Sequence, residues 1–231
     1  KEVVSMLANN NKMIINKLAK NSVKSNKKQY GILFFTIVLS AFMLFCVFTI
    51  GWTYLDSSRL QNTRLNGAEY DITTMNGFTS KQVKSLQSNK NIQNVGMESY
   101  AGFIKSSEFD NTVEIGLLWC DETFWNNLMS PARTKLDGHY PQNKNELMVT
   151  KDILKACGNE NLSVGDSIVL TYENNTGVHT DKFVISGIWD GYGDKSAGFV
   201  SKNFYDETGY DLKNDGILCI KLNRNYVLPT T

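Results

Sequence analysis

The most prominent feature in the pattern of hydrophobic and polar residues is one long apolar run near the start of the chain. Residues 32–50 read ILFFTIVLSAFMLFCVFTI, nineteen positions without a charge, a proline or a glycine. At about 1.5 Å per residue, a helix of this length crosses roughly the 30 Å hydrocarbon core of a bilayer. Tyr30 and Trp52 flank the run, where amphipathic rings favour the headgroup region. The pattern therefore predicts a transmembrane helix over residues 30–52.

Residues 53–66 continue the helical pattern beyond the span. Leu55, Leu60 and Leu65 alternate with polar residues, and no proline interrupts them. The Asn66-Gly67 pair ends the pattern, because glycine suits the position just after a helix. We therefore expect residues 53–66 to form a helical stalk.

Residues 67–231 alternate between apolar and polar positions in short stretches bounded by turn residues. The predicted strands cover 69–75, 91–95, 99–105, 113–119, 146–150, 167–172, 182–189, 197–201 and 216–222. The predicted helices cover 80–86, 122–129, 151–156 and 202–207. The first strands and helix read as a β-α-β unit, and the turn-rich stretch of about 134–192 reads as an inserted, mostly β subdomain. The fold class is thus α+β.

The head of the chain is basic and amphipathic. Residues 1–29 carry seven lysines against one acid, which leaves 17 basic and 22 acidic residues after position 29. Apolar residues recur at helical spacing at Ile14, Ile15, Leu18, Ala19 and Val23, with lysines on the other face. The positive-inside rule places residues 1–29 in the cytoplasm as an amphipathic helix and residues 53–231 outside. Such a helix lies on anionic lipid or contacts a cytoplasmic partner.

A cleaved signal peptide is the competing interpretation of the same pattern. Its apolar core usually has 7–15 residues, which is shorter than the run seen here. Thr49-x-Gly51 is a weak cleavage site, and the basic region before the run is long. These observations favour an uncleaved anchor in a bacterial cell membrane.

Catalytic chemistry finds little support in the sequence. His139 and His179 both lie in polar, turn-like surroundings, and no serine lies in a G-x-S-x-G context. The loop 190–194, DGYGD, lacks the spacing and closing glutamate of a calcium loop, and no P-loop occurs. We expect no catalytic, cofactor-binding or metal-binding residues and no enzyme activity. Because the basic cluster lies at the membrane face, nucleic-acid binding is excluded as well.

The cysteines do not form a disulfide framework. Cys46 lies in the span, and Cys120, Cys157 and Cys219 follow it. An odd external number without a close pair favours buried thiols, although one bridge stays open as an alternative. The absence of a C-x-x-C pair argues against a zinc site built from paired cysteines.

Three phrases, in order, resemble FtsX-like and MacB-like ABC transporter permeases. The first is NKLAKNSVKSNKKQYGILFFTIVLSAFMLFCVFTIG, which resembles the basic helix that leads into the first span of that family. The second is LDGHYPQNKNELMVTKDILKACGNENLSVGDSIVLTY, and the third is KFVISGIWD; both resemble stretches of the family's extracytoplasmic domain. The resemblance covers about residues 16–222. His139 departs from it, because arginine is common at that position.

The resemblance implies a permease subunit without its own ATPase. Its partners would be a cytoplasmic ABC ATPase, a second permease subunit, the lipid bilayer and an unknown extracytoplasmic peptide or protein. Residues 67–231 would be a MacB-like α+β domain that receives ATP-driven motion, in peptide or antimicrobial export, resistance or lipoprotein handling. With one span, the sequence is expected to be the N-terminal part of a longer protein.

Two other functions stay open at this point. The first is a single-span membrane receptor or sensor whose ectodomain binds a ligand or peptide. The second is a surface enzyme, which has the least support because no nucleophile, base and acid come together in the sequence. Further spans and an ATPase partner would favour the permease.

Overall fold

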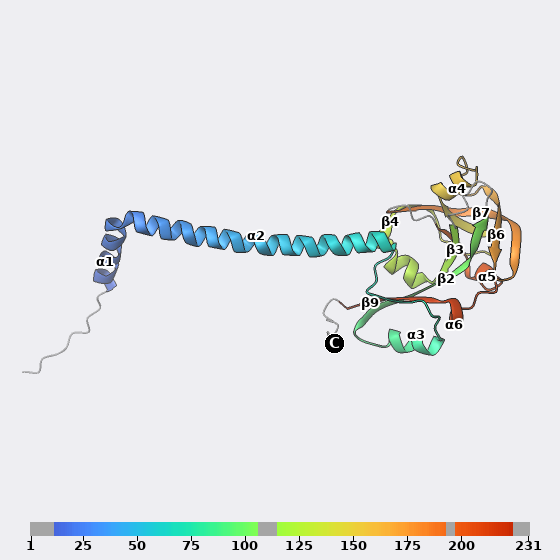
Figure 1. Ribbon diagram of the computed structural model, residues 1–231, viewed down its shortest axis with the longest axis horizontal. Helices are drawn as coiled ribbons and strands as arrows, with labels where there is room; N and C mark the ends of the chain where they lie inside the picture. The colour runs from blue at the N-terminus through green and yellow to red at the C-terminus, as the bar shows by residue number, and fades with distance from the viewer. Residues whose placement is uncertain (1–11, 106–114, 193–196, 224–231) are drawn as a thin grey trace, which may run out of the picture. The chain divides into compact units, whose positions relative to one another are not determined.

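Two helices form from the first 66 residues. In the computed structural model, which describes residues 12–105, 115–192 and 197–223, α1 covers Lys12–Ser25 and α2 covers Lys27–Asn66. The basic head thus becomes helical from Lys12 onward, and its first eleven residues lie outside the described part. Figure 1 shows α2 as one unbroken helix, as predicted for the span and the residues after it.

The contacts within the chain divide it into two compact units, Lys1–Ser58 and Arg59–Thr231. The second unit contains all of the strands in the described residues, together with short helices. The strands are β1 (Ile72–Thr74), β2 (Ile92–Lys105), β3 (Ile115–Cys120), β4 (Arg133–Gly138), β5 (Glu146–Thr150), β6 (Ser167–Asn174), β7 (Gly177–Gly191), β8 (Gly198–Val200) and β9 (Ile217–Leu222). The short helices are α3 (Ser80–Gln87), η1 (Phe124–Leu128), η2 (Ser130–Ala132), α4 (Lys151–Ala156), α5 (Lys202–Tyr205) and α6 (Leu212–Asp215). The α+β class is confirmed.

Six of these strands close into a ring. Strand β2 pairs with β3, β3 runs parallel to β8, and β8 pairs with β5. Strand β5 runs parallel to β7, β7 pairs with β6, and β6 pairs with the last three residues of β2. The stretch predicted as β-rich, about 134–192, supplies β4 to β7, which join the other strands in one nine-stranded sheet. Full closure removes free edges from the ring strands.

The main core fills this ring. All six ring strands contribute to one buried cluster, with alternate residues such as Leu117 and Trp119 in β3 and Phe183 and Ile185 in β7. Alternation follows from the strand's period of two, which sends every second side chain to the same face. A second cluster around Trp125, Trp189 and Phe199 packs on the other face of the same strands.

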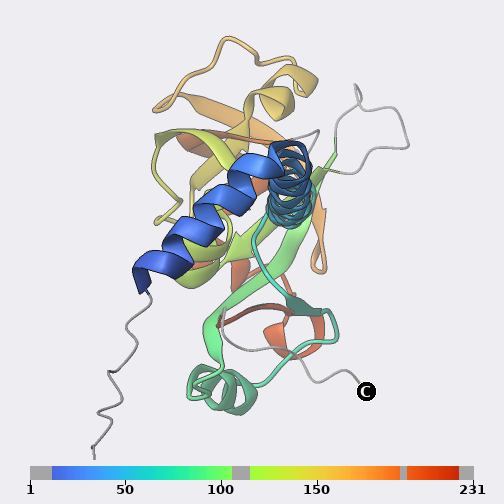
Figure 2. The same ribbon diagram turned by 90° about the vertical axis from the view of Figure 1, so that its left-hand side faces the viewer.

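A smaller layer lies at the end of the domain where β9 and α3 meet. Figures 1 and 2 both show α3 away from the β6–β7 hairpin. Helix α3 begins at a capping box, in which Thr79 and Gln82 each accept from the other's backbone N–H. The expected β-α-β unit differs in one respect: β9 lies between β1 and β2 and pairs with both. The strand at 216–222 was predicted, but its pairing with β1 and β2, whose residues lie more than 100 positions earlier in the chain, has no local signal in the sequence.

The structure differs from the prediction at three places in the sheet domain. Residues 91–95 and 99–105 form a single strand, β2, which pairs with β9 up to Glu98 and with β3 from Glu98 onward. Its pairing with β3 shifts register between Tyr100 and Gly102, which marks a bulge there. The turn-rich start of the predicted β subdomain carries no predicted strand at residues 136–138, but residues 133–138 form strand β4, whose side chains are nearly all exposed and so show no alternation. The helix at 122–129 contains a π-helical turn, in which the Met129 N–H donates to Phe124 O over 2.8 Å.

Candidate functional site

The apolar run of α2 has no partner within the described residues. Its large side chains are exposed, from Val38 at 46% to Phe35 at 73%, and none of the most apolar window is buried. Helix α2 is long and apolar enough to cross a membrane. The hydroxyls of Thr36 and Thr49 donate to the carbonyls of Ile32 and Phe45, over 2.9 and 2.8 Å, so both are satisfied inside the helix.

Helix α1 exposes its apolar positions too. Ile14, Ile15, Leu18 and Val23 are all exposed, and Lys17, Lys20 and Lys24 share the same short helix. Asn26 separates α1 from α2, and the Ser22 hydroxyl lies 3.3 Å from the Tyr30 hydroxyl. An exposed apolar stripe beside lysines suits the surface of an anionic membrane.

Side chains in the last turns of α2 contact the sheet domain. The Arg64 guanidinium lies 4.0 Å from the centre of the Tyr192 ring, and its Nη2 donates to the Tyr192 hydroxyl over 3.4 Å. Thr63 is buried in the same turn, and Gly67 ends the helix at a φ of 77°. The helix end is therefore held by the cation–π contact of Arg64 and by the burial of Thr63.

The segment after α2 adds two further connections. The Glu69 N–H donates to Leu128 O over 2.7 Å, and the Glu69 carboxylate pairs with Lys221 of β9 over 2.6 Å. This ion pair is mostly buried on the lysine side, where the side chain is 16% exposed. Ala68 is also buried, against the cluster of Trp125 and Phe199. The segment between α2 and the sheet is thus held by a hydrogen bond to Leu128 and by an ion pair with Lys221.

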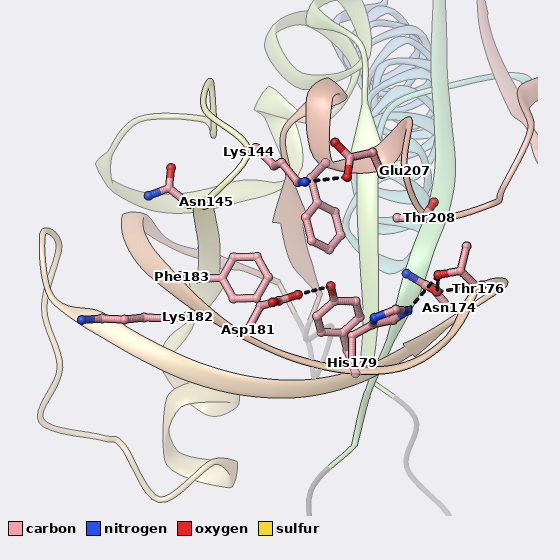
Figure 3. Close-up of a pocket in the computed structure, with 12 residues that line it drawn as sticks. Lys144, Asn145, Asn174, Thr176, His179, Asp181, Lys182, Phe183, Glu207 and Thr208 are labelled. Carbon is pink, nitrogen blue, oxygen red and sulfur yellow. Dashed lines mark hydrogen bonds and ion pairs between the residues drawn. The ribbon is translucent and has the colours of Figure 1, made fainter.

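A pocket of about 410 Å³ opens beside the β6–β7 hairpin. The rings of Tyr172, Phe183 and Phe204 line its floor, with centres 5.4 to 6.0 Å apart and at most 5% of each residue exposed. Figure 3 shows Lys144 and Glu207 along one side and Asp181 and His179 along the other. The pocket therefore combines an apolar floor with a charged rim.

Hydrogen bonds fix the rim. The Tyr172 hydroxyl donates to Asp181 Oδ2 over 2.6 Å, and the Lys144 ammonium pairs with Glu207 over 2.5 Å. Burial, and then the hydrogen bond to Asp181, raise the pKa of Tyr172, so the phenol keeps its proton and donates. Sequence reasoning missed this pair, although a hairpin centred on residues 174–177 brings positions 172 and 181 to the same face.

The two histidines lie apart from each other. His179 belongs to the pocket, stacked at 5.6 Å on Tyr172, with Nε2 2.8 Å from the Thr176 hydroxyl. His139 is exposed, and its Nδ1 lies 3.0 Å from the carbonyl of Tyr140. In the described ranges neither imidazole contacts a serine or cysteine, and no cluster of three or more metal-ligating side chains occurs there.

The other residues considered in the sequence analysis are the loop 190–194 and the four cysteines. Asp190 Oδ1 accepts from the N–H of Gly191 over 2.9 Å, while 193–194 of that loop lie outside the described residues. The structure forms no disulfide among the four cysteines, all of which lie in the described residues, so the bridge that the sequence left open is not present. Burial raises the pKa of Cys219 to about 12 and that of Cys120 as well, so both thiols stay protonated at neutral pH.

No protein-family model and no curated protein sequence matches the chain. Among solved structures, the chain is similar to the extracellular domain of the noncanonic ABC-type transporter YknZ from Gram-positive bacteria, with a TM-score of 0.44 and 11% identity over 64% of this chain and 75% of that one. It is also similar to the periplasmic region of MacB from Actinobacillus actinomycetemcomitans, with a TM-score of 0.43 and 12% identity over 68% and 76%. Because both scores lie below 0.5, we base the functional proposal on the chain's own residues.

Proposed function

We propose that this chain is a permease subunit of an ABC transporter of the FtsX-like and MacB-like type. The observation that carries the proposal is α2 itself, one helix that includes an exposed apolar span and ends in fixed contacts with the sheet domain. A helix transmits displacement along its axis because its backbone hydrogen bonds are internal. The motif order in the sequence points to the same family.

In this proposal, residues 1–29 face the cytoplasm and the ATPase, residues 30–52 span the bacterial cell membrane, and residues 53–66 are the stalk. Residues 67–231 are extracytoplasmic. ATP hydrolysis belongs to a separate subunit, and the chain itself is not an enzyme. The seven lysines of the head support the orientation through the positive-inside rule. The outer domain acts on an extracytoplasmic peptide or protein.

The test inserts Gly-Gly after Leu60 in the native transporter assembled with its ATPase. Two glycines cost the helix about 1 kcal/mol each and make it compliant. The matched control inserts Ala-Ala, which lengthens the helix by about 3 Å and rotates it by about 200° in the same way but keeps it stiff. We expect the ATP-dependent activity of the assembled transporter to fall further in the Gly-Gly variant than in the Ala-Ala variant. ATP hydrolysis by the ATPase subunit should persist in both.

Equal activity of the Gly-Gly variant and the unmodified transporter would contradict transmission through this helix. Affinity purification of the chain from its native membrane provides the second measurement. An ABC ATPase that copurifies with the chain supports the permease, and reproducible purification without one contradicts it.

A second candidate function is a single-span receptor, which the 410 Å³ pocket favours because concave sites with an apolar floor commonly bind small ligands. A receptor needs α2 only as a tether. It would therefore purify without an ATPase, and its ligand binding would tolerate the Gly-Gly insertion.

A further inference from the structure

The side chains that face into the pocket beside the β6–β7 hairpin carry more negative than positive charge. Asp181 and Glu207 contribute two carboxylates, and Lys144 is the basic side chain that pairs with one of them. Lys182 also borders the pocket, but it pairs in register with Val169, which is 62% exposed on the outer face of β6. Figure 3 shows the Lys182 ammonium pointing away from the pocket. One carboxylate is thus left without a cation.

Asp181 is that carboxylate. Among the described residues its one side-chain hydrogen bond is the 2.6 Å bond from the Tyr172 hydroxyl to Oδ2, which leaves Oδ1 open. The bond comes from a neutral phenol, so it orients the carboxylate without neutralising its charge. Because the Tyr172 ring is held among Phe183 and Phe204, the carboxylate is fixed relative to the aromatic floor.

We propose that this pocket binds an alkyl cation, an ammonium or guanidinium group on an aliphatic chain, with Asp181 as its charge partner. The aliphatic part lies on the floor of Tyr172, Phe183 and Phe204, and the charged end reaches Oδ1. A floor of buried rings with a few placed polar groups at its rim is the usual construction of a small-ligand site. An anion is disfavoured, because Lys144 is already paired with Glu207.

Two sources supply this chemistry, the side chain of a basic peptide and a free diamine. The inference goes beyond the permease proposal and does not depend on it, because equilibrium binding requires no ATPase. Failure of the binding experiment and failure of the permease proposal are therefore separate results.

The experiment uses the full chain in lipid nanodiscs with its histidine rings isotopically labelled. The probe is Nα-acetyl-lysine methylamide, and Nα-acetyl-norleucine methylamide is the uncharged control of similar length. The chain has two histidines, so His179 reports from the pocket and His139 reports from outside it. At constant pH we expect a saturable shift of the His179 resonances with the lysine probe, no shift with the norleucine probe, and no shift of His139 with either.

Asp181→Asn tests the charge partner, because asparagine keeps an oxygen that accepts the Tyr172 hydroxyl. We expect the affinity for the lysine probe to fall at least about tenfold, as for loss of a hydrogen bond between charged groups. Asp152→Asn is the matched control, the same substitution at an exposed carboxylate of α4 that does not line the pocket, and it should leave the affinity unchanged. The His139 resonances verify that each variant is folded.

Lys144→Gln should change the affinity for the lysine probe in the opposite direction. It removes the competing ammonium and frees the Glu207 carboxylate, so the lysine probe should bind about two- to fivefold tighter, the range expected for an exposed ion pair. Equal shifts with the norleucine probe, unchanged affinity in Asp181→Asn, or weaker binding in Lys144→Gln would each overturn the proposal. A parallel titration with cadaverine assigns the source, since tighter binding of cadaverine than of the lysine probe favours a free diamine and the reverse favours a peptide side chain.

Discussion

Phe45 in α2 and Phe199 in β8 place the same ring in opposite surroundings. Phe45 is 67% exposed, whereas Phe199 is 2% exposed and lies 5.3 to 5.5 Å from the rings of Trp125 and Trp189. The difference shows that apolar residues in this chain serve two purposes. Those of the sheet domain are buried by the chain's own fold, whereas those of α2 are exposed over a run long enough to cross a bilayer.

The comparison breaks most completely if the sheet domain lies on the cytoplasmic side of the membrane and the basic head lies outside. A cysteine introduced as Thr176→Cys should react with an impermeant maleimide on intact cells, because positive-inside topology places the sheet domain outside. Ser22→Cys should react only after the membrane is permeabilised. The unmodified chain, with its four native cysteines, provides the background, and the opposite labelling pattern would refute this topology.

The same substitution, phenylalanine to alanine, can be made in the buried core and in the exposed run of α2. Phe199→Ala should lower the free energy of unfolding of the sheet domain by about 3–5 kcal/mol, because it leaves a cavity among packed rings. Phe45→Ala removes the same atoms from a side chain that has no partner in the described residues, so the domain should unfold as in the unmodified chain. Denaturant titration in nanodiscs, followed by tryptophan emission, measures both, and similar losses would contradict the difference in surroundings.

The smallest expected effect is a dependence of stability on alkaline pH. Burial raises the pKa of Cys219 to about 12, while the thiol of the unfolded chain ionises near its ordinary value of 9. As pH rises from 9 towards 12, the unfolded state loses a proton that the folded state retains. Stability therefore falls with pH, by up to about 1.4 kcal/mol per unit for this group.

Cys219→Ala should flatten this slope, although it lowers stability at every pH through a small cavity. Cys46→Ala, which changes the span and not the domain core, should leave the slope unchanged. Thermal unfolding of the full chain between pH 8 and 11 measures the effect, and an identical slope for the unmodified chain and Cys219→Ala would count against it.

The local parts of this structure follow from the sequence, and the non-local parts do not. Helix α2, the Gly67 helix end and strand β5 have signals within a few residues, namely apolar length, a glycine and a β-rich run. Strand β4 was missed because an exposed edge strand is defined by its pairing with β7, which begins about forty residues later. The same reason explains why β9 between β1 and β2 was not expected.

The candidate sites divide in the same way. The histidines and cysteines can be recognised in the sequence by residue type alone, but their surroundings cannot. The structure places His179 at the pocket and His139 beside the carbonyl of Tyr140. The contacts that define the pocket and the helix end join residues far apart, such as Lys144 with Glu207 and Arg64 with Tyr192. Tyr172 and Asp181 are the exception, because a hairpin register relates them within one short segment.

Strand β2 has a consequence for how the domain opens in solution. Its first half pairs with β9, and its second half pairs with β3 and then with β6, so one strand belongs to both the small layer and the ring. An opening fluctuation that frees the backbone amides in the middle of β2 must separate both sets of partners. Hydrogen exchange at these amides therefore reports unfolding of the domain as one cooperative unit, whereas a domain made of two separate sheets would exchange in two steps.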